Sequence, residues 1–419
     1  MPPTTPQPDT LNSLSEWLGA PPFVRKLALP SCLERIRAAD DDLKAWVQVS
    51  PRAPLGDGPL FGVPIGVKDI FETEGLATEY GSEIYKGRVG TADAAIVREL
   101  RSRGAIVMGK TQTTAFAYRT PAPTRHPRDP AHTPGGSSSG SAAAVAAGMI
   151  PLALGTQTKG SVLRPASYCG ITGFKPTFGI VSTEGVLPFA KSLDTVGFFT
   201  HTPHDMAAFW ELYSGATVRE GEGATVREGE GATGGAIGAV ALDVEPAMSA
   251  AFDASIARLR DAGIDVRAID VSGLLADVSA AAETVMFFEA AQAHGERYDM
   301  YGDRLADVAD AVRRGRAISA ADYADALMSL ARYRLRMAEQ FETTPVVATP
   351  AATGPAPAGL EFTGDPAMNA PWTALGTPAI AVPLPVAGGL PLGLQLTAAH
   401  GQDAELLRAA CHVHDILRI

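Results

Sequence analysis

Three segments of this chain carry residues whose types and spacing could perform chemistry. The first, Gly62-Val-Pro-Ile-Gly-Val-Lys-Asp-Ile70, places Lys68 in an apolar stretch tightened by glycine and proline. Burial disfavours the ammonium form, so a buried Lys68 could be neutral near pH 7 and act as a base. Taken alone, however, the segment favours a surface lysine that is paired with Asp69.

Two segments rich in glycine and serine follow. Ser137 lies in residues 133–148, which could be a flexible linker or an anion-binding turn at a helix start. A linker would not lead directly into an Ala/Val helix and an apolar strand. Ser161 lies in residues 154–170, in a loop of small residues whose backbone N–H groups could converge on an oxyanion. The plainer interpretation of that loop is an ordinary connection between core elements.

Two familiar motif matches do not fit their context. Gly104-Ala-Ile-Val-Met-Gly-Lys-Thr111 matches the phosphate-loop pattern, but its middle residues are typical of a strand and no strong helix begins at Thr111. Gly136-Ser-Ser-Ser-Gly140 matches a nucleophile elbow centred on Ser138, but a turn rather than a strand precedes it. Nothing singles out a partner for Ser138 among His294, His400, His412 and His414.

Short apolar runs bounded by turn residues predict buried strands, and a helical pattern lies among them. The predicted strands are Gly104–Met108, Ile237–Ala241, Pro345–Ala348, Ala379–Val382 and Leu392–Leu396. One face of a predicted helix carries Met248, Phe252, Ile256 and Leu259. Strands mixed with helices in this way predict an α/β fold with a covered sheet.

The chain has 419 residues, of which 46% are apolar and 19% charged, and the shortage of charge is concentrated. No Asp, Glu, Lys or Arg occurs in residues 130–158 or 366–402. Prolines and glycines interrupt both windows, so neither is a membrane span of about 20 apolar residues. An uncharged lining would help to keep Lys68 neutral and would strengthen hydrogen bonds to an oxyanion. The shortage of charge therefore predicts that both windows are buried.

The bulk composition excludes several classes of protein. A net charge of −11 argues against a broad nucleic-acid surface, which needs clustered Lys and Arg. Three scattered cysteines predict neither a disulfide framework nor a zinc site. The Pro/Thr-rich start lacks the apolar core of a secretion signal, so residues 1–12 are expected to be a flexible tail and the protein to be cytoplasmic. A tandem octapeptide repeat predicts a surface loop over residues 215–233.

Taken together, the motifs resemble the amidase signature family. The resemblance rests on Gly-Gly-Ser-Ser-Ser-Gly-Ser-Ala-Ala-Ala-Val-Ala, Gly-Thr-Gln-Thr-Lys-Gly-Ser-Val-Leu-Arg-Pro-Ala-Ser, Gly173-Phe-Lys-Pro176, the Lys68 segment, and the regions Thr363–Trp372 and Gly389–Gln395. It covers about residues 55–415, and the spacing of 24 residues between Ser137 and Ser161 fits the family pattern.

The resemblance implies a single large α/β domain over residues 13–419, with a mixed sheet covered by helices on both faces. It implies a Ser–cis-Ser–Lys triad without cofactor or metal, in which Ser161 is the nucleophile, Ser137 the bridging serine and Lys68 the base. Ser161 would form an acyl-enzyme and ammonia or an amine would leave. The oxyanion would be held by the N–H groups of Thr158, Lys159, Gly160 and Ser161.

Three positions depart from the usual family pattern. Lys159 stands where glycine is usual; it would be strained if the site needs a positive φ, or its ammonium could favour anionic substrates or reach solvent. Gln157 stands where Asp is frequent. Leu163 replaces the usual Arg, and Arg164 follows one place later, as in malonamidase-like members. Arg164 could then clamp a substrate carboxylate, or it could hydrogen-bond loop carbonyls.

We therefore expect an amidohydrolase that cleaves the C–N bond of a small carboxamide, with a carboxylate-bearing amide as the narrower hypothesis. One alternative is a glutaminase subunit that feeds ammonia to a partner, resembling the transamidosome A subunit. The other is a catalytically silent scaffold, motivated by Lys159. We expect a small-molecule substrate and no nucleic-acid or membrane partner, and either a homodimer or a complex with a partner subunit is compatible with these hypotheses.

Overall fold

The computed structural model describes residues 11–218, 235–386 and 388–418. Within these residues the strands are β1 (Trp46–Arg52), β2 (Pro64–Lys68), β3 (Ile106–Thr111), β4 (Leu152–Gln157), β5 (Thr172–Lys175), β6 (Thr195–Thr200), β7 (Ile237–Ala239), β8 (Val266–Ala268), β9 (Val346–Pro350), β10 (Ala379–Pro383) and β11 (Gly393–Ala398). The α-helices are α1 (Leu14–Gly19), α2 (Pro22–Leu43), α3 (Ala95–Ser102), α4 (Ser139–Ala146), α5 (Leu163–Cys169), α6 (Pro203–Ser214), α7 (Pro246–Asp261), α8 (Ser272–Tyr301), α9 (Asp307–Arg316), α10 (Ala320–Thr343), α11 (Ala370–Leu375) and α12 (Asp403–Arg418). Short 3-10 turns are η1 (Glu83–Tyr85), η2 (Ala115–Ala117) and η3 (Gly302–Leu305).

The strands form one mixed sheet, which confirms the predicted fold class. Their order is β1-β3-β2-β4-β6-β5-β10-β11-β9-β7-β8. Strand β2 runs parallel to β3 and β4, and β7 runs parallel to β8 and β9. The strands between these two groups pair in antiparallel fashion. The parallel group around β2 matters most for function, because parallel strands end at the same edge of a sheet.

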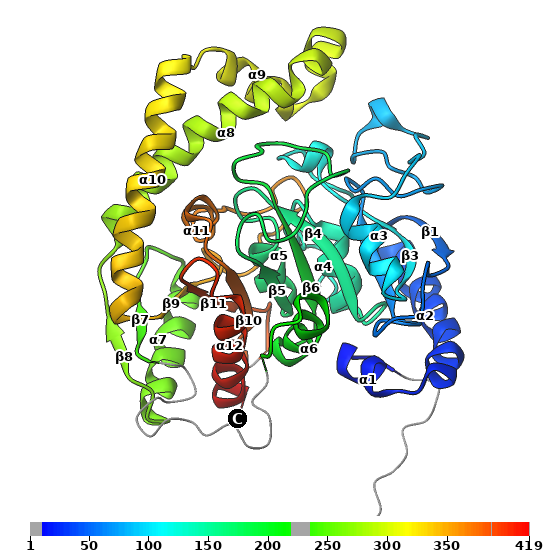
Figure 1. Ribbon diagram of the computed structural model, residues 1–419, viewed down its shortest axis with the longest axis horizontal. Coiled ribbons are helices and arrows are strands. Elements are labelled where there is room, and N and C mark those ends of the chain that lie inside the picture. The colour runs from blue at the N-terminus through cyan, green and yellow to red at the C-terminus, as the bar shows by residue number, and fades with distance from the viewer. Residues whose placement is uncertain (1–10, 219–234, 387, 419) are drawn as a thin grey trace, which may run out of the picture.

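Helices cover both faces of the sheet, as predicted (Figure 1). Helices α4 and α5 pack together against β2, β4, β5 and β10, whereas α12 packs with α6 and α7 against β10 and β11. Residues at the helix ends determine where these helices begin and end, as α6 illustrates. Thr202 caps α6 by accepting a hydrogen bond from the Asp205 N–H, Pro203 occupies its first turn, and Gly215 ends it with a φ of 76°.

The predicted elements are confirmed with small shifts at their ends. The strands expected at 104–108, 237–241, 345–348, 379–382 and 392–396 are β3, β7, β9, β10 and β11, and the helix expected at 248–259 is α7. Since Gly109 and Lys110 belong to β3, the phosphate-loop match is a strand, as its composition indicates.

One residue of the tail predicted over residues 1–12 is packed against the fold. Leu11 is buried, and its carbonyl accepts hydrogen bonds from the Trp17 indole and the Arg35 guanidinium, so Leu11 belongs to the folded unit. Residues 1–10 lie outside the described part of the chain. Most of the octapeptide-repeat loop predicted at 215–233 also lies outside it, because only Gly215 to Val218 are described.

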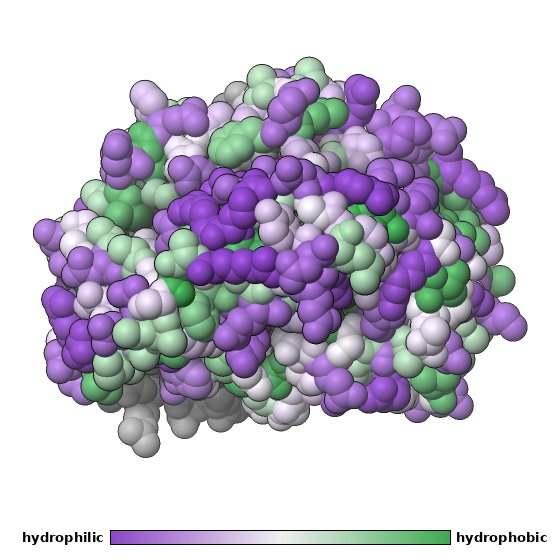
Figure 2. All heavy atoms as spheres, turned by 90° about the horizontal axis from the view of Figure 1, so that it is seen from above, coloured by the Kyte–Doolittle hydropathy of each residue, from purple (hydrophilic) through white to green (hydrophobic). Residues whose placement is uncertain are grey.

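Helices α8, α9 and α10 project from the sheet as an arm, at the upper left of Figure 1. Helix α8 packs against α9, α10 and α11, and α11 connects the arm to the rest of the molecule. Seen from above, hydrophilic side chains cover most of the surface, and apolar residues form small scattered patches (Figure 2). Among the described residues, no helix is long and apolar enough to cross a membrane.

A buried ion pair stabilises the loop that follows β2. Lys110 Nζ lies 3.5 Å from Asp69 Oδ1, and both side chains are fully buried. The ammonium also donates to the Phe71 carbonyl at 2.6 Å, and the Asp69 carboxylate accepts from the Glu79 N–H at 3.0 Å. The pair thus fixes the backbone directly after Lys68.

We predict that Lys110→Met lowers the free energy of unfolding by about 3–5 kcal/mol, because it leaves the Asp69 carboxylate buried without its counter-charge. Urea denaturation measures the change. The control is Lys86→Met, which removes the exposed ammonium of the Lys86–Glu79 pair and should cost about 0–1 kcal/mol. Equal effects of the two substitutions would contradict this role of the buried pair.

Candidate active site

Lys68 lies at the edge of the sheet where β2 and β4 both end. The two strands are parallel, with Val67 opposite Leu154. Lys68 is fully buried, and its Nζ lies 2.7 Å from Ser137 Oγ and 2.8 Å from Thr156 Oγ1. The interpretation of Lys68 as a surface residue is therefore wrong, and so is its pairing with Asp69, which faces Lys110 instead.

Burial holds the pKa of Lys68 well below its ordinary value, and the more distant Asp194 carboxylate opposes this shift only in part. Two other lysines, Lys110 and Lys175, are equally buried. Lys175 Nζ donates to two carbonyls, and Lys110 Nζ contacts a carbonyl, a carboxylate and a hydroxyl. Carbonyls can only accept hydrogen bonds, whereas a hydroxyl can also donate to a neutral amine. Of the three lysines, only Lys68 has hydroxyl groups alone as its hydrogen-bond partners.

Ser137 is brought to Lys68 by a sharply folded segment before α4. The peptide bond between Gly136 and Ser137 is cis, and Ser137 itself is buried. Helix α4 can approach the sheet because Gly140 lacks a side chain: a Cβ there would collide with the Ala45 carbonyl and the Gln112 N–H. Ser138 Oγ contacts the backbone N–H and carbonyl of Thr156 at 3.3 Å, so it ties this segment to β4.

Ser161 lies in the loop that connects β4 to α5, and it is partly exposed whereas Lys68 and Ser137 are buried. The Gln157 side chain organises this loop. Its Oε1 accepts hydrogen bonds from the N–H groups of Val162 and Leu163 at 2.8 and 3.0 Å, and its Nε2 donates to Thr373 at 2.9 Å. A carboxylate at position 157 could make the first two bonds but could not donate the third.

The C-terminal part of the chain holds the same loop from the other side. Thr373 Oγ1 donates to the Lys159 carbonyl at 2.8 Å. A Cβ on Gly160 would lie 2.6 Å from Asn369 Oδ1, so only glycine fits there. The N–H groups of Lys159, Gly160 and Ser161 donate no hydrogen bond to any described residue. These three donors are thus left unused in a loop whose backbone is fixed.

Lys159 adopts an ordinary backbone conformation, since it is not among the described residues with a left-handed φ. The strain considered for a lysine at this position therefore does not arise. Its side chain is partly exposed, and burial lowers the pKa of Lys159. Charges of both signs act on this ammonium: Glu283 and Asp365 favour it, and Arg119 and Arg164 oppose it.

Arg164 connects the two serine segments. Its Nη2 donates to the carbonyl of Gly136 at 2.6 Å, directly before Ser137, and its Nε donates to the Thr363 carbonyl at 2.8 Å. The side chain is buried, and its Nη1 has no partner among the described residues. Two of its three nitrogens thus bind loop carbonyls, and the third is buried without a partner among the described residues.

Sequence reasoning missed two residues of the site, Thr156 and Asp194. Thr156 is the second hydroxyl beside Lys68. Asp194 Oδ1 accepts from Thr158 Oγ1 at 2.5 Å, and its Oδ2 accepts from the N–H groups of Phe189 and Ala190. Burial raises the pKa of Asp194 to about 6, and these hydrogen bonds limit the rise. Asp194 could have been found only from the pairing of two strands, because β6 begins directly after Asp194 and pairs with the end of β4.

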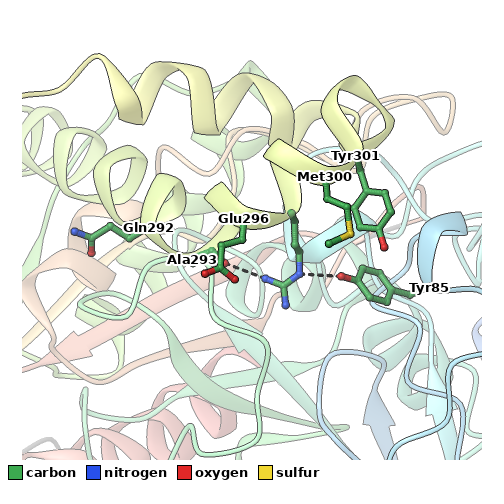
Figure 3. Close-up of a pocket in the computed structure, with 7 residues that line it drawn as sticks. Tyr85, Gln292, Ala293, Glu296, Met300 and Tyr301 are labelled. Atoms are coloured by element: carbon green, nitrogen blue, oxygen red, sulfur yellow. Dashed lines mark hydrogen bonds between the residues drawn. The ribbon is translucent and has the colours of Figure 1, made fainter.

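The histidines considered as partners of Ser138 do not form a hydrolytic triad with it. His294 is buried between Phe116 and Phe189, and burial lowers its pKa to about 3. Ser138 Oγ is occupied by the Thr156 backbone. A separate surface hollow of about 430 Å³ lies along α8, where Arg297 donates to the Tyr85 hydroxyl, and none of the predicted site residues lines it (Figure 3).

A mixed α/β sheet with a buried lysine against a serine, beside a loop of free backbone donors, is an arrangement suited to a serine-dependent hydrolase. The chain belongs to the Amidase family, whose model matches residues 28–407. It is accordingly a hydrolase that acts on amide C–N bonds.

Relatives and solved structures agree with this assignment. The chain is 33% identical to the A subunit of the Glutamyl-tRNA(Gln) amidotransferase of Symbiobacterium thermophilum, over 89% of this chain and 87% of that protein. Its fold matches the crystal structure of an amidase, with a TM-score of 0.82, 28% identity, and coverage of 95% and 96% of the two chains. It also matches the A subunit of the Thermotoga maritima Glutamyl-tRNA(Gln) amidotransferase, with a TM-score of 0.81, 27% identity, and coverage of 97% and 94%.

Proposed function

We propose that the protein releases ammonia from a primary carboxamide through an acyl-enzyme on Ser161, with Ser137 as the proton relay and Lys68 as the base. The observation that carries the proposal is the position of the Lys68 amine, which is fully buried between two hydroxyl groups. A neutral amine there can accept the Ser137 proton, and Ser137 can in turn accept the proton of Ser161.

The proposed reaction balances without any further reactant except water. Ser161 Oγ bonds to the amide carbon while its proton passes through Ser137 to Lys68. As the C–N bond breaks, the same proton returns to the leaving nitrogen, which departs as ammonia. Water then attacks the ester carbon and gives one proton to the same relay. As the bond between this carbon and Ser161 Oγ breaks, the relay returns that proton to Oγ, so that the carboxylic acid leaves and the Ser161 hydroxyl and the neutral Lys68 are regenerated.

The loop before α5 provides the electrostatic part of the proposed mechanism. The free N–H groups of Lys159, Gly160 and Ser161, together with that of Thr158, are the proposed donors to the tetrahedral oxyanion. Donors of this kind act strongly because they are fixed before the reaction, and each is worth about 3–4 kcal/mol of barrier. Asp194 is proposed as a positioning residue, since its carboxylate accepts the hydrogen bond of the Thr158 hydroxyl and so holds Thr158 in place.

We predict that Ser161→Ala lowers kcat by at least about 10⁴-fold, because the nucleophile is lost. A fluorophosphonate should label Ser161 in the unaltered protein and should not label the variant. Ammonia release and mass spectrometry of the labelled peptide check both outcomes. Ser167→Ala is the matched control, since this buried hydroxyl on α5 has no partner among the described residues. Normal turnover by Ser161→Ala would refute the proposal.

We predict that Lys68→Arg lowers kcat/KM by about 10²–10⁴-fold, because a guanidinium stays protonated and cannot accept a proton. In the unaltered protein, activity should rise with pH as the Lys68 ammonium loses its proton. Since burial lowers the pKa of Lys68, this rise should be complete well below pH 10.5. An unchanged pH profile in Lys68→Arg would show that another group acts as the base.

The substrate that we propose carries a carboxylate on its acyl part. Two cationic side chains support this hypothesis: Arg164, whose buried Nη1 has no partner among the described residues, and Lys159, which is a partly exposed residue. In this proposal, the two bonds from Arg164 to Gly136 and Thr363 hold the guanidinium in place, so that its third nitrogen can bind the substrate.

A second candidate is an ammonia-supplying glutaminase subunit. It is favoured by the similarity to the A subunit of a Glutamyl-tRNA(Gln) amidotransferase over nearly the whole chain. The mixture of charges around Lys159 also supports it, because glutamine carries both a carboxylate and an ammonium beside its amide. In that function a partner subunit would receive the ammonia.

Ammonia release from malonamate, succinamate, glutamine and neutral propionamide separates these candidates. We predict that the anionic amides are preferred over propionamide, and that Lys159→Met raises KM for the anionic amides while leaving KM for propionamide unchanged. Preference for glutamine, together with a stoichiometric partner in the natively purified complex, would favour the second candidate. A protein that releases no ammonia from any of these amides, alone or in that complex, would be the silent scaffold.

A further inference from the structure

Helix α10 packs on the molecule through one narrow face only. Its buried side chains are Leu330, Met337 and Phe341, and it packs against α8 and α11. Ser319 caps its start by accepting a hydrogen bond from the Asp322 N–H, and its interior is rich in Ala, Leu, Met and Arg, which favour helix. The helix lies along the left edge of the molecule in Figure 1.

A second apolar stripe runs along the exposed side of α10. Its residues recur at alternating intervals of three and four, which places them on one helix face in the pattern of a coiled coil. They are Ala321, Ala324, Met328, Ala331, Leu335 and Ala338, all of which are exposed. Met328 is 54% exposed and Leu335 is 69% exposed. Nothing in the described part of the chain covers this stripe.

We propose that the stripe is the interface for a second copy of this chain, whose α10 packs against it in antiparallel fashion. In the register that aligns the two stripes, Met328 faces Ala331 of the second copy and Leu335 faces Ala324. Ala321 faces Ala338. Every large side chain therefore meets an alanine, which allows the two helices to approach closely and to interdigitate.

The charges beside the stripe support the same register. Asp322 and Asp325 lie on the N-terminal half of α10, whereas Arg332 and Arg336 lie on the C-terminal half. When the apolar layers are aligned, Asp325 stands beside Arg332 of the second copy, and Asp322 stands beside Arg336. The two-fold axis repeats both pairs, which gives four opposite-charge pairs. None of these four side chains forms an ion pair with another described residue of its own chain.

A parallel arrangement of the same two helices would lose this match. In a parallel pair the residues that flank one side of the seam face those that flank the other side, so Asp325 would stand beside Ala320 and Arg332 beside Leu327, and no opposite-charge pair would form. The parallel arrangement would also align Leu335 with Leu335. The sequence of α10 is thus self-complementary in one orientation only, and this favours a second copy over an unrelated partner.

The stripe spans 18 residues, or about 27 Å at a rise of about 1.5 Å per residue. One helix pair of this length lies at the lower end of stable interface sizes, so we expect a dimer that dissociates on dilution, with a Kd of about 1–100 µM. Both copies keep their sites, because the stripe contains none of the residues proposed to act on the amide.

Sedimentation of the full-length protein over a range of concentrations tests the proposal. The unaltered chain should pass from monomer to dimer, and Leu335→Glu should weaken the dimer by at least about 100-fold, because it brings charge into the apolar seam. Ammonia release should stay unchanged in this variant. The matched control is Met300→Glu, which changes an equally exposed side chain on α8 and should leave the dimer intact.

A charge exchange tests the orientation. Asp325→Arg should weaken the dimer, and the double variant Asp325→Arg/Arg332→Asp should restore it, since the opposite-charge pairs form again. Restoration would support the antiparallel register. A chain that stays monomeric at several hundred micromolar, a dimer that is insensitive to Leu335→Glu, or a failure of the double variant to recover would overturn the proposal.

Discussion

The contact between the Lys68 amine and the Ser137 hydroxyl is the interaction on which the proposed chemistry depends. An ammonium in this position would be useless as a base, so the amine must lose its proton near neutral pH. Full burial, two hydroxyl partners and the absence of charge in residues 130–158 all act in that direction. The distant Asp194 is the opposing influence. Neighbouring Asp69 does not interfere, because Lys110 pairs with it.

The remaining elements of the site serve to hold three separate stretches of chain against this contact. Arg164 ties the loop of Ser161 to the carbonyl before Ser137. Gln157 and Thr373 fix the same loop to α11, which belongs to the second uncharged window. Most of these bonds use neutral groups, and the one cation among them, Arg164, binds only carbonyls. Rigidity is thus achieved without placing a carboxylate in hydrogen-bond contact with Lys68, where it would restore the positive charge.

Much of the fold and part of the site could be predicted from the sequence, because they depend on local patterns. Apolar runs such as Ala379–Val382 read directly as strands, and the string around Ser137 resembles a known family closely enough to indicate its partners. The lack of charge marks residues 130–158 and 366–402 as buried, and the hydrogen bond from Gln157 to Thr373 brings the two windows together.

The Lys68 segment alone favoured a surface lysine, and only the family resemblance indicated that Lys68 is the base. Whether Lys68 points into the core or toward solvent is decided by how β2 packs against its neighbours. The contact of Asp194 with Thr158 could not be predicted from the sequence either, since only the pairing of β4 with β6 brings the two residues together.

The central claim, that Lys68 is a neutral base acting on Ser161 through Ser137, is tested most directly by the rate at which a fluorophosphonate labels Ser161 at different pH. The account predicts a rate that rises with pH, levels off well below the ordinary lysine pKa of 10.5, and falls sharply at all pH values in Lys68→Arg. A rate that keeps rising toward pH 10.5, or one that Lys68→Arg leaves unchanged, would contradict it.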